Sequence, residues 1–176
     1  MRRLRHKAGR ARAPAGQDRT VGGAGCAAVS EAWRIERIAR PEELPDLLNF
    51  VDGACAEARL PDDIAFAVRL ATEEACMNVI KHGYRGQLPG PIAIGITRGP
   101  SQVVVTIEDR GTEFDPSSVP APALDACAEL RPLGGLGWHL ITQSMDEVRH
   151  EHDAVKGNTL TLRKCIPSQR IHSGDS

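Results

Sequence analysis

Two consecutive segments of strictly alternating residues constrain the fold of this chain most. Residues 91–98 read PIAIGITR and residues 101–109 read SQVVVTIED, and in both segments an apolar side chain recurs at every second position. This alternation predicts β-strands. Gly99 and Pro100 lie between the segments and predict a turn. The centre of the chain is therefore expected to be a pair of adjacent strands.

The segments on either side of this pair predict the remaining elements. Residues 32–39 alternate like a strand, residues 41–60 show helical spacing, and Pro61 in a first turn opens a second helix that runs toward Gly83. A loop with room for one short helix follows at 115–135. A third helix at 137–151, one further strand within 148–154 and a final strand at 158–166 complete the order. This order predicts a two-layer α/β (α+β) sandwich: a mixed, mostly antiparallel sheet with its helices on one face.

Composition and charge exclude several classes of protein. With 176 residues the chain is expected to hold one domain, and its net charge of −1 is unlike that of an electrostatic nucleic-acid binder. The five cysteines form no C-x-x-C pair and are expected to be small buried or semi-buried thiols, as suits a reducing cytosol. No run of 18 apolar residues exists. We therefore expect a cytoplasmic protein without direct nucleic-acid or membrane contacts.

Both ends of the chain differ from the expected domain at 32–166. The first 31 residues are rich in Gly and Ala, lack periodicity and are expected to be a disordered extension. Their basic residues are Arg2, Arg3, Arg5, Lys7, Arg10, Arg12 and Arg19. The alternatives are a basic arm that touches nucleic acid or a partner, an inert tail, or a start codon that was assigned too early. Residues 167–176 are expected to be a loose polar tail.

The second helix carries an unusual set of polar residues in TEEACMNVIKHGY, residues 72–84. Glu74 and Asn78 are four residues apart and share a helix face, and Lys81 and His82 follow one turn later. A solvated face of an amphipathic helix would explain such a stripe. A carboxylate, an amide oxygen and two cationic groups would also suit a phosphate and metal site.

Three later stretches favour the second interpretation. In IEDRGTEFDP a strand ends at Asp109, whose carboxylate could accept a hydrogen bond from the exocyclic amine of a flat ring. Gly111 would let the backbone approach that ring closely. LGGLGWHLI, residues 133–141, starts a helix with glycines, where free N–H groups favour a phosphate. KGNTLTL, residues 156–162, reads as a turn and a strand. Each stretch alone is also compatible with an ordinary turn or tight loop.

In this order the four motifs resemble those of the GHKL ATP-binding superfamily, which includes histidine kinases and gyrase. They are most similar to its small anti-sigma-factor serine kinases, the switch-kinase branch, over roughly residues 33–166. The resemblance implies a histidine-kinase-like ATP-binding fold with ATP and Mg²⁺ as cofactors. It implies Glu74 as the general base and Asn78 as the magnesium ligand. The nucleotide-binding residues that it implies are Asn78, Lys81, His82, Asp109, Gly111, Phe114, Gly135, Leu136, Gly137 and Thr159.

The implied function is that of an ATP-dependent protein serine/threonine kinase in a partner-switching system. Its expected substrate is a STAS-type anti-sigma-factor antagonist, and a sigma factor or other regulator is its second partner. Related modules commonly dimerise through their sheet, so the resemblance also includes a homodimer. We expect neither a dimerising helical hairpin of the histidine-kinase type, which the N-terminal extension does not resemble, nor a transducer domain after Ile166. The alternative function is a nucleotide-gated module that sequesters a partner without transferring phosphate.

Overall fold

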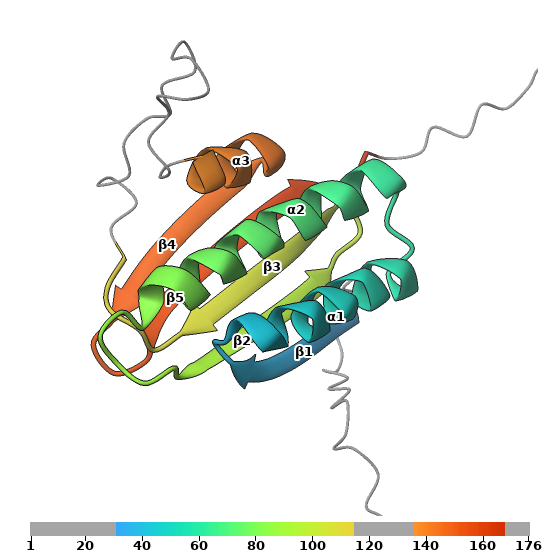
Figure 1. Cartoon of the computed structure of the whole chain (residues 1–176). Helices are drawn as coiled ribbons and strands as arrows, with labels where there is room; N and C mark the ends of the chain where they lie inside the picture. The colour runs from blue at the N-terminus through green and yellow to red at the C-terminus, as the bar shows by residue number, and fades with distance from the viewer. Residues whose placement is uncertain (1–30, 115–135, 168–176) are drawn as a thin grey trace, which may run out of the picture.

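In the part of the chain that the structure describes, one antiparallel sheet carries three α-helices on a single face (Figure 1). The structure is a computed structural model that describes residues 31–114 and 136–167. Within these ranges the strand order is β1-β2-β3-β5-β4 and every neighbouring pair is antiparallel. The strands are β1 (Glu31–Ile38), β2 (Pro91–Arg98), β3 (Gln102–Asp109), β4 (Glu147–Asp153) and β5 (Gly157–Cys165).

The helices form the second layer of the sandwich. A short 3₁₀ turn, η1 (Pro41–Glu43), leads into α1 (Leu44–Glu57), and α2 (Asp62–Asn78) continues directly into a π-helical turn, η2 (Val79–Gly83). The third helix is α3 (Leu136–Ser144). The predicted fold class is confirmed. The sheet differs in one respect, because the described strands contain no parallel pair that would make it mixed.

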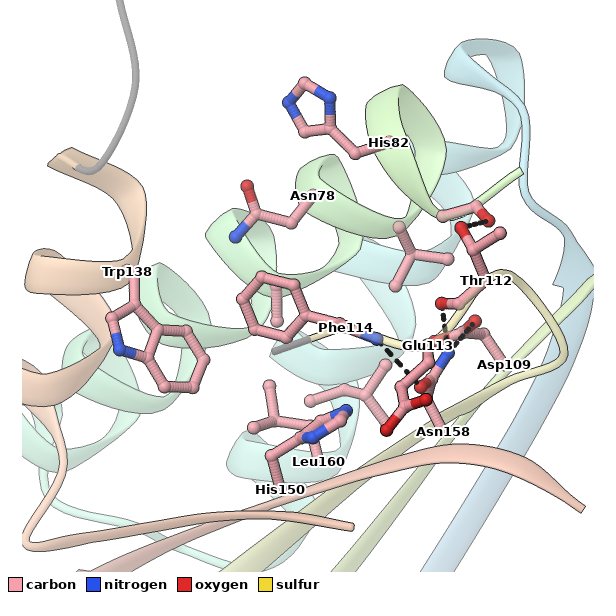
Figure 2. A pocket seen from close by; sticks show the side chains of 14 residues that line it. Asn78, His82, Asp109, Thr112, Glu113, Phe114, Trp138, His150, Asn158 and Leu160 are labelled. Atoms are coloured by element: carbon pink, nitrogen blue, oxygen red, sulfur yellow. Dashed lines mark hydrogen bonds between the residues drawn. The ribbon is translucent and has the colours of Figure 1, made fainter. Parts of the chain in front are cut away.

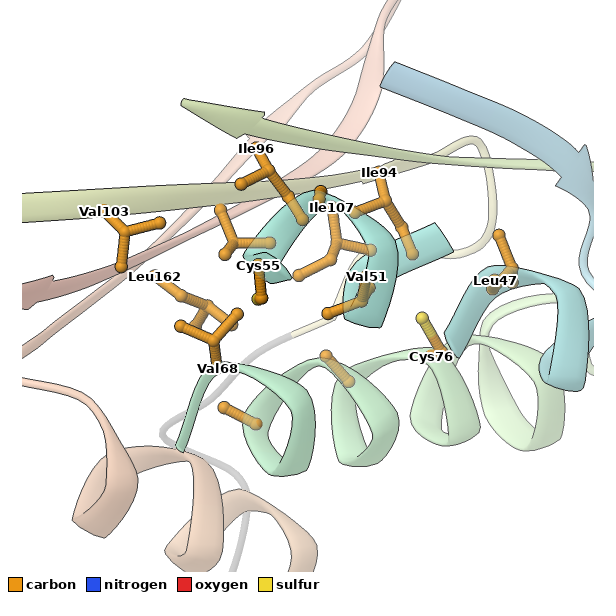
Figure 3. Packing of buried hydrophobic residues seen from close by; sticks show 14 of the residues in the cluster. Leu47, Val51, Cys55, Val68, Cys76, Ile94, Ile96, Val103, Ile107 and Leu162 are labelled. Carbon is orange, nitrogen blue, oxygen red and sulfur yellow. The ribbon is translucent and has the colours of Figure 1, made fainter. Parts of the chain in front are cut away.

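The alternating pattern of β2 and β3 places one row of each strand in the core (Figure 3). Ile92, Ile94 and Ile96 pair in register with Asp109, Ile107 and Val105 of β3, and the apolar members of both rows are almost fully buried. They pack against apolar residues of α1 and α2. Burial of each such side chain contributes about 1.5–3 kcal/mol. This packing fixes the register of β3 and hence the position of Asp109 at its end.

The segment after α3 corrects the predicted helix at 137–151. The helix ends at Ser144, and the chain enters β4 at Glu147, close to the further strand predicted within 148–154. Asp146 explains the change of direction. Its backbone N–H donates to Arg163 O at 2.9 Å, and its carboxylate accepts from Cys165 N at 2.7 Å and Lys164 Nζ at 3.1 Å. These bonds to β5 compete with helix continuation, which local periodicity could not reveal.

Two of the cysteines are buried thiols, as expected. Burial raises the pKa of Cys55 to about 11 and that of Cys76 to about 12, so both remain protonated near neutral pH. Cys165 is exposed instead, and Cys26 and Cys127 lie outside the described residues. Among the residues that the structure describes, we find no helix with the length and apolar character that a membrane span requires.

Tyr84 joins three elements beside the site. Its hydroxyl donates to Pro91 O at 2.6 Å, at the start of β2, and accepts from Arg110 N at 2.9 Å, just after β3. Burial raises the pKa of this hydroxyl, which favours the protonated form that can donate. The end of the second helix is thereby fixed relative to the end of β3.

Candidate nucleotide site

A pocket opens between the helix layer and the sheet, where α2 and η2 face the ends of β3 and β5 (Figure 2). α3 and β4 complete it through Trp138 and His150. Its lining combines apolar walls with a few converging polar groups, which is typical of a small-molecule site. The lining residues are Ala75, Asn78, Val79, His82, Gly83, Ile107, Asp109, Thr112, Glu113, Phe114, Trp138, His150, Asn158 and Leu160.

Asp109 is the buried carboxylate of this pocket, with 8% of its surface exposed. Its Oδ1 accepts from Gly111 N at 2.8 Å and from Asn158 Nδ2 at 3.0 Å. The described residues make no hydrogen bond to Oδ2. One oxygen is therefore used to hold the carboxylate in place, and the other remains available to a ligand that donates a hydrogen bond.

Asn158 on β5 orients Asp109 and was not among the predicted site residues. Its Nδ2 must face Asp109, because an ionised carboxylate can only accept hydrogen bonds. Nδ2 also donates to Thr112 O at 3.0 Å, while Oδ1 accepts from Phe114 N at 3.3 Å. His152 Nδ1 lies 3.0 Å from Oδ1, so this orientation requires the proton on Nδ1. All the hydrogen-bonding groups of the Asn158 side chain are engaged.

Gly111 allows the turn after β3 to approach the end of η2. A Cβ at this position would lie 2.9 Å from Asp109 Oδ1 and would overlap the carbonyl group of Gly83. Thr112 donates to the same carbonyl oxygen from its N–H at 2.7 Å and from its hydroxyl at 2.9 Å. The close approach at Gly111 is therefore to the protein's own backbone, whereas the sequence had predicted an approach to the ring of a ligand.

Glu74 and Asn78 lie one helical turn apart on α2, on the side that faces Gly137 of α3. A Cβ on Gly137 would lie 2.6 Å from Glu74 Oε2 and 3.8 Å from Asn78 Oδ1. Asn78 lines the pocket, and Glu74 lies beside it. The neighbouring Glu73 is engaged elsewhere, since Arg69 Nη1 donates to its Oε2 at 3.1 Å. Of the two glutamates, Glu74 is thus the one next to the pocket.

His82 and Lys81 are neighbours in the π-helical turn, but only the side chain of His82 lines the pocket. His82 lines the pocket together with Asn78, and its Nδ1 lies 3.2 Å from Arg85 Nη2. Lys81 is exposed and lies outside the lining. A π-turn holds an additional residue per turn and so changes which side chains share a face with α2. The spacing expected for a regular helix had placed Lys81 and His82 on one stripe.

Thr159 does not reach the pocket. It follows Asn158 on β5 and precedes Leu160, and both of these neighbours line the pocket. Because successive side chains of a strand point to opposite faces, Thr159 faces away from the helices. The sequence had predicted Thr159 as the nucleotide-binding residue of this strand, whereas the adjacent Asn158 is the one that lines the pocket. Leu136 is 51% exposed and outside the lining, and Gly135 lies outside the described residues.

Three ring side chains form one wall of the pocket. Phe114, which was predicted, lies between Trp138 and His150 and makes edge contacts with both, each with ring centroids 5.4 Å apart (Figure 2). Trp138 stands in the glycine-containing start of α3, whereas His150 lies on β4 without a recognisable motif. Only the position of Trp138 within LGGLGWHLI could have suggested it from the sequence.

The comparison with protein families agrees with this geometry. The model described as a histidine kinase-like ATPase domain matches residues 38–164, which is more than half of the chain. The chain belongs to the histidine kinase-like ATPase domain family. Two similar proteins are the serine-protein kinases RsbW of Bacillus licheniformis and Bacillus cereus. The first is 26% identical over 77% of this chain and 86% of that protein; the second is 30% identical over 64% and 70%, respectively.

A solved structure supports the same histidine kinase-like ATPase fold. It contains the RsbU and RsbW domains of a Mycobacterium tuberculosis protein, with a TM-score of 0.54 and 18% identity. The match covers 76% of this chain and 32% of that chain, so the present chain spans about a third of it. Together with the relatives, the family places this chain among the ATP-binding protein serine kinases of the anti-sigma-factor type.

Proposed function

We propose that the chain is a protein serine/threonine kinase of a partner-switching system, which transfers the terminal phosphoryl group of ATP to a STAS-type anti-sigma-factor antagonist. A sigma factor or another regulator would be its second partner. The observation that carries this proposal is the position of Glu74 and Asn78 against Gly137, next to the pocket that holds Asp109. Base recognition and phosphoryl transfer would then take place at the two ends of one site.

The pocket suits the adenine end of ATP. Asp109 has one carboxylate oxygen held by Gly111 N and Asn158 Nδ2 and the other available to accept from an exocyclic amine. Ala75, Val79 and Leu160 add apolar wall. A flat base needs such a combination, because the walls exclude water while the carboxylate fixes orientation. From this end, the phosphates would extend along α2 toward Asn78 and α3.

The transfer step would be performed at Glu74. Its carboxylate would take the proton from a serine or threonine hydroxyl of the partner protein. The hydroxyl oxygen would form a bond to the terminal phosphorus as the bond from that phosphorus to the bridging oxygen of ADP breaks. Phosphoryl transfer depends chiefly on positioning and charge neutralisation, and a positioned base contributes about 10²–10⁴-fold.

The residues near the phosphate end fit Mg²⁺. The ion prefers oxygen ligands and is commonly held by one or two protein groups together with substrate phosphates. Asn78 would supply an amide oxygen, and the carboxylate of Glu74 lies one turn away. A bound Mg²⁺ would offset negative charge on the phosphates. Asn78 would keep the phosphates aligned with Glu74.

The relatives, which are serine-protein kinases named RsbW, support a protein substrate for this chain. We would test it by incubating the full chain with Mg·ATP and a purified STAS-domain antagonist from the same genome. Intact-mass analysis should show the gain of one phosphoryl group on the antagonist. A complex that forms with an antagonist of unchanged mass would instead support the nucleotide-gated binding module.

Replacing Gly137 by alanine should lower the transfer rate more than nucleotide affinity. The added Cβ would lie 2.6 Å from Glu74 Oε2, so the carboxylate would have to move away. A displacement of about 1 Å at a reacting group can lower a rate by about 100-fold. The measurements are the single-turnover phosphorylation rate and the dissociation constant of ADP.

Gly53→Ala is the matched control for this variant. Gly53 also lies within a helix, α1, and a Cβ there would meet no heavy atom within 4 Å. The control should transfer phosphate at the wild-type rate. Equal rates for Gly137→Ala and the wild type would show that Glu74 does not act from this position.

A further inference from the structure

His150 is a polar residue in the pocket wall with no role in the site described so far. Its Nε2 is buried and has no hydrogen-bond partner among the described residues. The side chain nevertheless lines the pocket together with Asp109 and Asn158. A buried polar atom without a partner destabilises the fold, and in a pocket the missing partner can be supplied by a ligand.

The surroundings of His150 favour a neutral imidazole. Desolvation by burial lowers the pKa of His150 from the ordinary value of 6.5, and repulsion from His152 acts in the same direction. Asp109, Asn158 and Glu113 act in the opposite direction but do not reverse the shift. Near neutral pH the ring therefore offers one N–H donor and one acceptor nitrogen.

The aromatic wall fixes the orientation of this ring. Phe114 packs edge-on against His150 with an interplanar angle of 89°, and against Trp138 at 63° (Figure 2). A ring held by such contacts presents its nitrogens in a defined direction. His150 therefore combines a ring that is held in position by packing with an Nε2 atom that has no hydrogen-bond partner among the described residues.

We propose that neutral His150 hydrogen-bonds the nucleoside part of the bound nucleotide and is an affinity-determining residue of this pocket. The inference rests on the proposed ATP site and assigns that site a further contact. Protonation of His150 would remove its acceptor nitrogen and would place a charge in the apolar wall. The benefit of His150 to nucleotide binding should therefore be largest at neutral pH and decline under acidic conditions.

The test compares ADP binding by the wild type and by His150→Phe with calorimetry at about pH 7.5 and about pH 5, on either side of the ordinary histidine pKa. Phenylalanine keeps a ring against Phe114 but lacks both nitrogens. We expect the variant to bind about 2- to 12-fold more weakly at the higher pH, which corresponds to one hydrogen bond. The ratio of the two dissociation constants should be no larger at the lower pH, and it should fall toward one as the pH passes below the lowered pKa of His150.

The ratio isolates His150 because every other titratable group, including the phosphates of ADP, is the same in both proteins. His139→Phe, on α3 outside the pocket lining, is the matched control and should bind like the wild type at both pH values. His150→Leu also removes both nitrogens and provides the same ratio if the phenylalanine variant does not fold. A ratio of one at the higher pH, or a ratio that rises as the pH is lowered, would overturn the inference. Absence of ADP binding by the wild type would instead refute the nucleotide site itself.

Discussion

Glu74→Gln should bind ATP with nearly wild-type affinity and yet transfer phosphate about 10²–10⁴-fold more slowly. Glutamine keeps the size and most of the hydrogen-bonding capacity of glutamate, but its amide cannot take a proton from a hydroxyl at neutral pH. Glu74 lies beside the lining of the nucleotide pocket, so the nucleotide contacts should remain. Single-turnover phosphorylation of the antagonist and an ADP titration measure the two effects separately.

Glu73→Gln provides the control because it makes the same chemical change one residue away. The Glu73 carboxylate accepts from Arg69 Nη1 at 3.1 Å in an exposed i,i+4 pair, which contributes only about 0.3–0.5 kcal/mol to stability. This variant should transfer phosphate normally. If both variants were equally active, Glu74 would not be the base. A rate loss in Glu73→Gln alone would assign the role of base to Glu73.

The sequence predicted the fold well where side-chain periodicity is governed by the core. Alternation in β2 and β3 and helical spacing in α1 and α2 follow directly from burial of one face, so these elements lie close to the predicted ranges. The boundary between α3 and β4 could not be predicted in this way. It depends on Asp146, which bonds to Lys164 and Cys165 on β5. Such bonds join residues far apart in the sequence.

The candidate site was predictable in part for the same reason. Asn78 and Asp109 stand in motifs with regular local geometry, and the structure brings both to one pocket. Lys81 and Thr159 lie outside the pocket lining because a π-turn and the alternation of β5 determine which side chains face inward. His150 lies in no motif, and only the packing of β4 beside β5 brings it to the pocket.

Asp109→Asn should weaken ATP binding by about 10- to 150-fold, the range for a lost hydrogen bond to a charged group. The asparagine oxygen can still accept from Gly111 N and Asn158 Nδ2, as Oδ1 does now. The amide nitrogen would then occupy the place of Oδ2 and present a donor to the exocyclic amine, which is also a donor. Binding should therefore weaken by this factor while the fold is retained, as thermal unfolding with and without ADP would show.

Glu108→Gln separates this effect from a general loss of negative charge. Glu108 precedes Asp109 on β3 but points to the opposite face of the sheet, where its Oε2 lies 2.8 Å from Arg34 Nη2. The two variants lose the same charge at adjacent positions, and only one of these positions faces the pocket. ADP should raise the unfolding temperature of Glu108→Gln as it does for the wild type, because ligand binding stabilises the folded state. An equal stabilisation of Asp109→Asn by ADP would mean that this carboxylate does not recognise the base.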